Sequence, residues 1–158
     1  MKMSKTMTAV VAIVAAGWLV IMMAMVAMAA TRDADKVQGS LSSTLEEISA
    51  AGLTGTAISP FDVYGEDWVA VGFVCPGFTD EMIEKEMNLD PSLFGTEGEV
   101  PEDENYIVVR DQGGAAHVEK FSRDELDLCA SPMPGYFDSR MMIPMVKTEQ
   151  GNWVLASQ

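Results

Sequence analysis

The chain has few of the side chains from which metal centres and many catalytic sites are built. It contains a single histidine, His117, and two cysteines, Cys75 and Cys129. A protein zinc site takes three or four His or Cys ligands, so the supply is short. No C-x-x-C pair, C-x-x-C-H haem motif, G-x-S-x-G elbow or phosphate loop is present. We therefore expect no catalytic residue, no metal and no cofactor, with His117 a structural or surface histidine.

Basic residues are also scarce. The chain has 10 Lys and Arg against 24 Asp and Glu, a net charge of −14. Residues 31–158 hold all 24 acidic residues and 8 of the basic ones, so this part carries 8 − 24 = −16. Such a surface repels nucleic acid and anionic lipid head groups, which argues against both as partners. It is compatible with a basic protein partner, with divalent cations or with solubility alone.

Charge of either sign is absent from Thr6 to Thr31, directly after Lys2 and Lys5. Within this run, residues 7–30 would make a helix about 36 Å long, against a membrane hydrocarbon core of about 30 Å. We predict a transmembrane helix over 7–30, with residues 1–6 in the cytoplasm. A stalk over 31–40 and an acidic domain over 41–158 then lie outside the cell membrane. A signal peptide cleaved after Ala29 is the alternative, and the length of the apolar run favours the anchor.

Small residues recur along this predicted helix at Thr8, Ala12, Ala16 and Gly17. Residues of this size at a spacing of four allow a second membrane helix to approach closely. They predict a contact face for a larger integral membrane protein complex. An alanine-rich helix that faces lipid on all sides explains the same pattern equally well.

The two cysteines both lie in the part predicted to be exported. An even count in an oxidising compartment predicts one disulfide, Cys75–Cys129. Closing a loop of this length reduces the freedom of the unfolded chain by about 4 kcal/mol in the loop-entropy model. Two free buried cysteines are the alternative.

Sequence periodicity after residue 40 predicts an α+β domain. Helices are expected from a capping box at Ser43 to a C-terminal glycine at Gly52, and from an N-cap at Thr79 to Met87. A second capping box at Ser122 predicts a short helix that ends near Cys129. A helix of a single turn is expected over residues 91–94, between Asp90 and Gly95.

The strands are predicted to form a mainly antiparallel sheet with the helices on one face. Residues 68–74 are apolar at successive positions, which indicates a central strand. Residues 106–110 and 116–121 flank a glycine turn and predict one hairpin, and residues 141–146 and 153–155 predict a second. Pro144 cannot donate a ladder hydrogen bond, so its strand is expected at an edge or a bulge.

Two surface segments are candidate partner sites. An acidic loop precedes the first hairpin and contains Glu97, Glu99, Glu102, Asp103 and Glu104. The D-x-[DN]-x-[DN]-G calcium pattern is absent, which favours a solvated loop over a calcium site, and a basic exported protein is its functional interpretation. A proline-rich loop carries Met133, Tyr136 and Phe137, which suit either a binding surface or the closure of the core.

Taken with the missing catalytic set, these features predict a non-catalytic, membrane-anchored accessory subunit. An envelope enzyme, a ligand-binding receptor domain and a secreted protein are the alternatives. In its overall layout the chain resembles small envelope proteins of actinobacteria. The shared features are Lys2 and Lys5 before an Ala- and Met-rich span, an acidic exported domain and a single pair of cysteines. Some of these envelope proteins are accessory subunits of the respiratory cytochrome bc–oxidase supercomplex. The resemblance implies a place on the outer face of such a complex and no redox centre in this chain.

Overall fold

The computed structural model describes Trp18 and residues 37–96, 98–131, 133 and 135–156. The chain divides into two units, Met1–Lys36 and Val37–Gln158. The second unit thus begins at Val37, four residues before the start predicted for the domain. Val37 packs against the core, and the Gln38 amide donates to the Tyr64 carbonyl at 3.2 Å.

The predicted membrane segment 7–30 lies outside the described residues, apart from Trp18. Within the part of the chain that is described, no helix is long and apolar enough to cross a membrane. The predicted helix contact face also lies outside it: Thr8, Ala12, Ala16 and Gly17.

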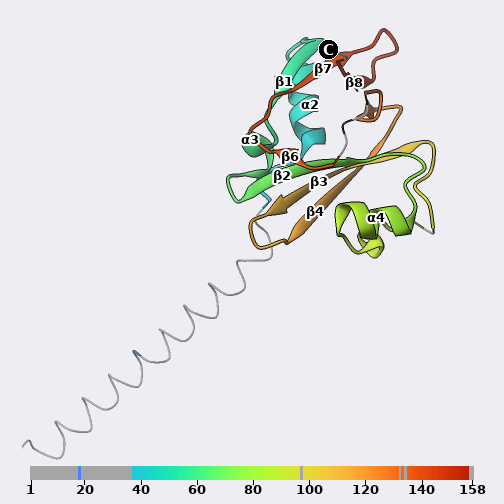
Figure 1. The fold of residues 1–158 in the computed structure, drawn as a ribbon. Helices are drawn as coiled ribbons and strands as arrows, with labels where there is room; N and C mark the ends of the chain where they lie inside the picture. The colour runs from blue at the N-terminus through green and yellow to red at the C-terminus, as the bar shows by residue number, and fades with distance from the viewer. Residues whose placement is uncertain (1–17, 19–36, 97, 132, 134, 157–158) are drawn as a thin grey trace, which may run out of the picture. The chain divides into compact units, whose positions relative to one another are not determined.

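The unit Val37–Gln158 has the predicted α+β class, with mainly antiparallel pairing, but it contains two sheets where one was expected (Figure 1). The helices are α2 (Leu41–Ala50), α3 (Pro60–Tyr64), α4 (Asp80–Met87) and the single-turn η2 (Pro91–Phe94). The strands are β1 (Gly55–Ile58), β2 (Trp68–Val74), β3 (Glu104–Asp111), β4 (Ala116–Ser122), β5 (Leu126–Asp127), β6 (Phe137–Asp138), β7 (Ile143–Lys147) and β8 (Trp153–Leu155).

The central sheet has the order β4-β3-β2-β6, and the second sheet has the order β1-β7-β8-β5. Both predicted hairpins are confirmed, as β3–β4 and β7–β8. Among the described strands, only β5 and β8 pair in parallel. The prediction of β2 as an inner strand is confirmed, because β3 and β6 flank it.

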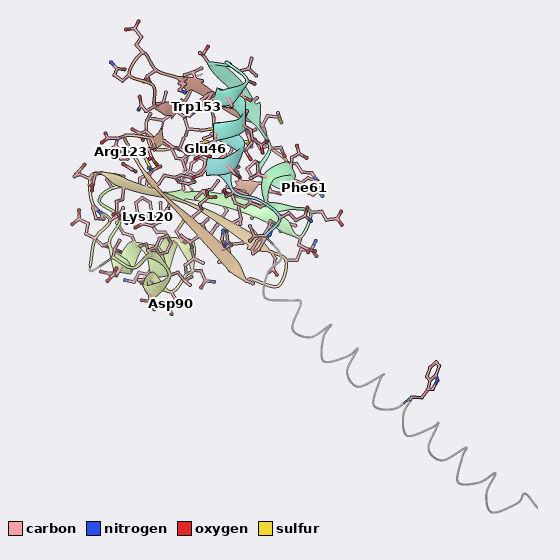
Figure 2. The ribbon with its side chains drawn as sticks, turned by 180° about the vertical axis from the view of Figure 1, so that it is seen from behind. Glu46, Phe61, Asp90, Lys120, Arg123 and Trp153 are labelled. Carbon is pink, nitrogen blue, oxygen red and sulfur yellow. A yellow bond between two sulfur atoms is a disulfide. The ribbon has the colours of Figure 1, made fainter. Side chains whose placement is uncertain are left out.

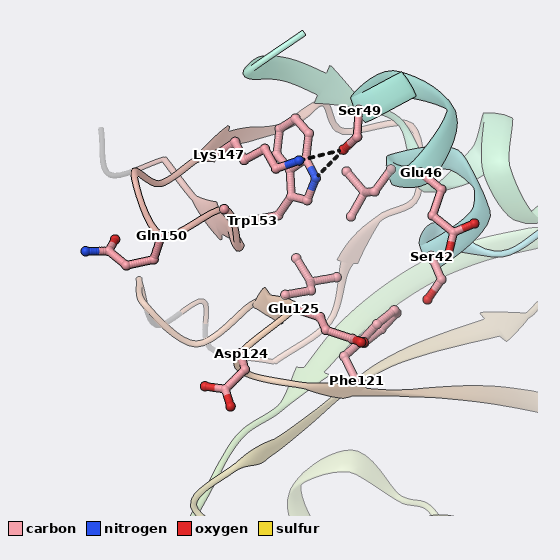
Figure 3. Close-up of a pocket in the computed structure, with 12 residues that line it drawn as sticks. Ser42, Glu46, Ser49, Phe121, Asp124, Glu125, Lys147, Gln150 and Trp153 are labelled. Atoms are coloured by element: carbon pink, nitrogen blue, oxygen red, sulfur yellow. Dashed lines mark hydrogen bonds between the residues drawn. The ribbon is translucent and has the colours of Figure 1, made fainter. Parts of the chain in front are cut away.

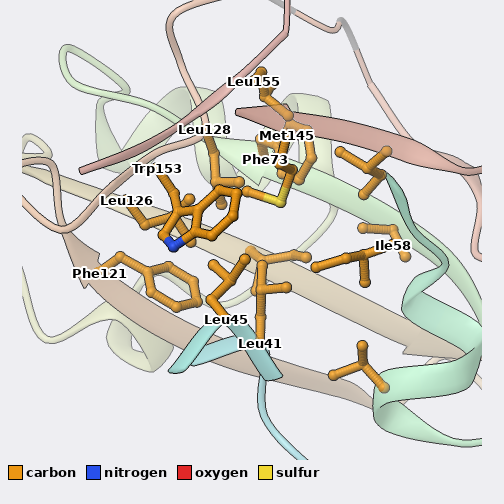
Figure 4. Close-up of a cluster of buried hydrophobic side chains, with 14 of the residues drawn as sticks. Leu41, Leu45, Ile58, Phe73, Phe121, Leu126, Leu128, Met145, Trp153 and Leu155 are labelled. Atoms are coloured by element: carbon orange, nitrogen blue, oxygen red, sulfur yellow. The ribbon is translucent and has the colours of Figure 1, made fainter. Parts of the chain in front are cut away.

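Both faces of the central sheet are buried, and side chains alternate between two cores. On β3, Ile107 and Val109 enter the large core, whereas Tyr106 and Val108 enter the small core. The large core lies between the central sheet, the second sheet and α2 (Figure 4). The small core is covered by α4 and η2 on the opposite face of the central sheet (Figure 1).

Helix α2 begins at Leu41, two residues before the predicted capping box. Ser40 is the N-cap, and its hydroxyl accepts from the Ser43 amide at 3.2 Å. The earlier start places both Leu41 and Leu45 in the large core, one turn apart on the same face. The predicted C-terminal glycine is confirmed: Gly52 has a φ of +77° and its amide donates to the Ser49 carbonyl.

The predicted short helix after Ser122 is wrong. A turn closes from the Glu125 amide to the Ser122 carbonyl, and the chain then extends as β5. Leu126 and Leu128 both enter the core, an alternation that an extended chain provides and a helix does not. The capping-box pattern is overridden by this burial and by hydrogen bonds to a distant side chain.

That side chain is Asn105, which is fully buried on β3. Its amide nitrogen donates to the Leu126 carbonyl at 2.8 Å, and its amide oxygen accepts from the Leu128 backbone at 3.0 Å. The Asn105 side chain therefore holds β5 to the central sheet, because it supplies hydrogen-bond partners to the backbone on each side of Asp127.

We predict that Asn105→Leu lowers the free energy of unfolding by about 2–4 kcal/mol, because it leaves two buried backbone groups without partners. Urea unfolding measures this loss. Gln112→Ala, in the exposed β3–β4 turn, is the control and should stay within about 0.5 kcal/mol of the natural protein. Equal stability of the two variants would contradict the role given to Asn105.

The edge or bulged position predicted for the Pro144 strand is also wrong, because β7 is an inner strand with a continuous register to both neighbours. Pro144 lies on β7, between β1 and β8, and pairs with Ala57. Its carbonyl accepts from the Ala156 amide at 2.9 Å, at the point where β8 ends. In an antiparallel ladder the N–H and C=O of one residue face the same neighbour. The missing N–H therefore faces the end of β8, and the β1–β7 ladder stays intact.

The disulfide Cys75–Cys129 is confirmed, with the two Cα atoms 5.7 Å apart. It joins the residue after β2 to the turn that follows β5, not to the end of a helix as predicted. The bond thus ties the central sheet to the strand at the edge of the second sheet.

We predict that reduction of this bond lowers the melting temperature by more than about 10 °C, since the long loop it closes corresponds to about 4 kcal/mol. Differential scanning calorimetry with and without reductant measures the shift. A Cys75→Ala/Cys129→Ala variant should have the melting temperature of the reduced protein, and reductant should not change it. An unchanged melting temperature on reduction would contradict this prediction.

Candidate functional site: a pocket rimmed by carboxylates

The first turn of α2 is held by a side chain from the central sheet. The Glu119 carboxylate on β4 accepts from the Leu41 amide at 3.0 Å and from the Ser42 amide at 3.2 Å. Ser40 takes the Ser43 amide, so the first amides of the helix all have acceptors. A carboxylate here also suits the positive end of the helix dipole.

The same carboxylate accepts the hydroxyl of Tyr64 at 2.6 Å. Tyr64 is fully buried, and this burial, together with the adjacent Glu119, raises the pKa of its phenol well above the usual value. His117 lies two residues before Glu119 on β4, with its ring 6.1 Å from Tyr64 and 6.2 Å from Trp68. The histidine thus packs among aromatic rings at the edge of the large core.

We predict that Tyr64→Phe flattens the alkaline limb of the stability curve. Below about pH 10 the phenol keeps its proton in both the folded and the unfolded state, so Tyr64 contributes fully to the free energy of unfolding. Above that pH the unfolded chain ionises while folded Tyr64 does not, and stability falls by about 1.4 kcal/mol per pH unit for each such tyrosine.

Urea unfolding between neutral and strongly alkaline pH measures this slope. Tyr106→Phe should have the same effect, because burial and a hydrogen bond to Glu104 raise the pKa of Tyr106 too. The double variant should lose both contributions. An alkaline slope that neither substitution changes would refute the assignment.

A pocket of about 460 Å³ opens beside α2, where the second sheet meets the turn between β4 and β5 (Figure 3). Its floor belongs to the large core and is formed by buried apolar side chains from four elements: Leu45, Phe121, Leu126 and Trp153. The floor is therefore the outer surface of the core rather than a separate site, and each of its side chains is no more than 5% exposed.

Three exposed carboxylates line the pocket from two sides. Glu46 comes from α2, and Asp124 and Glu125 come from the β4–β5 turn. The view in Figure 3 shows Glu125 beside Phe121 and Glu46 beside Ser42. Carboxylates thus lie on two sides of an apolar and aromatic floor, and Lys147 lines the same pocket.

A hydrogen-bonded group forms the far wall of the pocket. The Ser49 hydroxyl accepts from the Trp153 indole N–H and from the Lys147 ammonium, each at 3.2 Å. Lys147 also lies 5.9 Å from the centre of the Trp153 ring. The pocket therefore already holds one ammonium group of this chain against an aromatic ring.

Cation recognition is the chemistry that this arrangement supports. Carboxylates attract an ammonium or guanidinium group, and the apolar floor accepts the aliphatic stem that carries it. Across the described part of the chain, no group of three or more His, Cys, Asp or Glu side chains is placed to hold a metal ion.

The predicted acidic loop is partly used inside the molecule. Glu104 pairs with Lys120 and accepts the Tyr106 hydroxyl, and these hydrogen bonds lower the pKa of its carboxyl. The Glu102 and Asp103 carbonyls accept from Arg123, and their carboxylates, like that of Glu99, are exposed (Figure 2 labels Lys120 and Arg123). Glu97 lies outside the described residues. As a partner surface this loop stays a prediction.

The side chains of the proline-rich loop are half-buried. Tyr136 donates to the Met87 carbonyl at 3.2 Å and lies under Arg110, at the C-terminal end of α4. Phe137 packs edge-on against Phe73 with ring centres 5.3 Å apart, and Met133 packs against the large core. Their predicted role in partner binding is likewise open.

Sequence reasoning missed the pocket because its members are separated by about a hundred residues along the chain. Ser49 on α2 meets Lys147 and Trp153 on the last hairpin. The one available signal is the pair of acidic residues Asp124 and Glu125 beside the apolar Leu126, which the capping-box interpretation assigned to a helix.

Comparison with protein-family models, with curated proteins and with solved structures found no match to this chain.

Proposed function

We propose that the Val37–Gln158 unit is a non-catalytic interaction domain that takes a lysine or arginine side chain of a basic protein partner into the carboxylate-rimmed pocket. The observation that carries this proposal is the combination of Glu46, Asp124 and Glu125 around the aromatic floor. The net charge of −16 over residues 31–158 supports it, because it steers a basic protein toward the domain.

Charge alone is too weak to define this site. Each exposed ion pair contributes only about 0.2–1 kcal/mol. Covering about 100 Å² of apolar stem on the floor adds about 2.5 kcal/mol. Together these give at most about 4 kcal/mol before the entropy cost of association, so the dissociation constant for one side chain is about 1 mM or weaker. Stable attachment therefore needs further contacts or a tether.

The predicted membrane helix is the natural source of that tether. A domain anchored beside its partner meets it at a high effective concentration, so a weak pocket contact becomes sufficient. In this proposal the chain is an accessory subunit on the outer face of a larger membrane complex. The resemblance stated above makes a respiratory supercomplex the first complex to examine.

We predict that a fluorescent lysine-rich peptide binds the full-length protein in detergent, and that Glu46→Gln/Asp124→Asn/Glu125→Gln weakens binding about three- to hundredfold. Fluorescence anisotropy measures the affinity at low ionic strength and at 0.15 M salt. Because the Debye length falls from about 30 Å to about 8 Å over this range, binding should also weaken with salt.

Two matched variants remove the same number of charges elsewhere. Glu81→Gln/Glu84→Gln/Glu86→Gln changes exposed residues of α4, and Glu99→Gln/Glu102→Gln/Asp103→Asn changes the predicted acidic loop. Both should weaken binding much less than the pocket variant does. Equal losses in all three would show that only net charge matters and would overturn the pocket. A greater loss in the loop variant would move the site to the acidic loop.

A further inference from the structure

A second cavity, of about 270 Å³, lies at the end of the second sheet and is lined by the methionines Met133, Met141 and Met142. Its remaining wall is formed mainly by the apolar residues Ile143, Pro144 and Leu155. We propose that this methionine pocket binds Cu(I) through the three thioether sulfurs. The proposal concerns a different part of the molecule from the carboxylate-rimmed pocket and does not depend on it.

The chain holds the turn before two of these methionines in a defined place. Ser139 is fully buried; its amide donates to the Val69 carbonyl at 3.1 Å, and its carbonyl accepts from the Phe61 amide at 2.9 Å. The Met141 amide then donates to the Asp138 carbonyl at 2.9 Å, which closes the turn. The backbone that carries Met141 and Met142 is therefore positioned before any ligand arrives.

Met133 reaches the same cavity from the loop between β5 and β6. It is half-buried, and it packs against the large core. On the opposite wall, the hydrogen bond from the Ala156 amide to the Pro144 carbonyl fixes the end of β8. Two separate segments thus bring methionine side chains to one cavity with anchored walls.

Two of the methionines are open to solvent. Met141 is 46% exposed and Met142 is 54% exposed, whereas Met87 and Met145 lie in the cores. A ligand from solvent can therefore reach both side chains without any rearrangement of the core.

The donor set selects the metal. Thioethers are soft, uncharged ligands that favour Cu(I) over Zn²⁺, Ca²⁺ and Mg²⁺. Among the described residues that line this cavity, only Ser131 has a side-chain oxygen, so these residues offer little to a hard ion. Cys75 and Cys129 are joined in a disulfide, which removes the stronger thiolate ligands from competition. An apolar wall also suits a monovalent ion better than a divalent one.

The test is an NMR titration of the full-length protein in detergent, with its methionine methyl groups labelled with ¹³C. Ag(I) serves as the redox-stable analogue of Cu(I), and single Met→Leu variants assign the resonances. The methyl signals of Met133, Met141 and Met142 should shift together and saturate at one equivalent. Met82 and Met87 on α4 should not respond. Shifts that are absent, or spread equally over all methionines, would overturn the proposal.

A second measurement uses Cu(I) itself, supplied anaerobically as its acetonitrile complex against a chromophoric Cu(I) chelator. The natural protein should retain one equivalent of Cu(I) more than Met141→Leu/Met142→Leu, a volume-conserving change at exposed positions that leaves the fold intact. Met82→Leu is the matched control and should retain the same Cu(I) as the natural protein. Equal retention by all three proteins would refute the site, since no thioether of the pocket would then be a ligand.

Discussion

The architecture depends on burying both faces of β2 and β3. Val71 and Phe73 point to one side of the central sheet and Val74 to the other, and β3 repeats the alternation with Ile107 and Val108. A sheet with two apolar faces must be covered on both. The helices α4 and η2 cover one face, while the other is covered by α2 and the whole second sheet.

This division explains where the pocket lies. The large core is covered by elements that are far apart in the sequence, and α2 meets the β7–β8 hairpin through contacts such as those of Ser49 with Lys147 and Trp153. The pocket opens between these elements. The first turn of α2 stays in register because Glu119 from the central sheet accepts its amides. The position of Glu46 at the rim therefore depends on hydrogen bonds between α2 and the central sheet, not on the pocket itself.

Local pattern was sufficient for the elements whose hydrogen bonds are local. The caps at Thr79 and Gly52, the two hairpins and the disulfide between the only two cysteines all follow from short stretches of sequence. Local pattern gave the wrong structure where a residue far along the chain determines the conformation of a segment. Asn105 fixes β5 as a strand against a capping-box signal, and β1 makes β7 an inner strand despite Pro144. The pocket could not be predicted for the same reason, since its parts meet only after folding.

Cation binding in the pocket is tested most directly by following the indole N–H resonance of Trp153 during titration with n-butylammonium, a mimic of the lysine side chain. This N–H donates to Ser49 in the wall of the pocket, whereas Trp68 packs near His117 elsewhere in the large core. We expect a saturable shift of the Trp153 resonance in the millimolar range, little change at Trp68, and no matching shift with n-butanol. No response of Trp153, or an equal response to n-butanol, would contradict a pocket that recognises a cation.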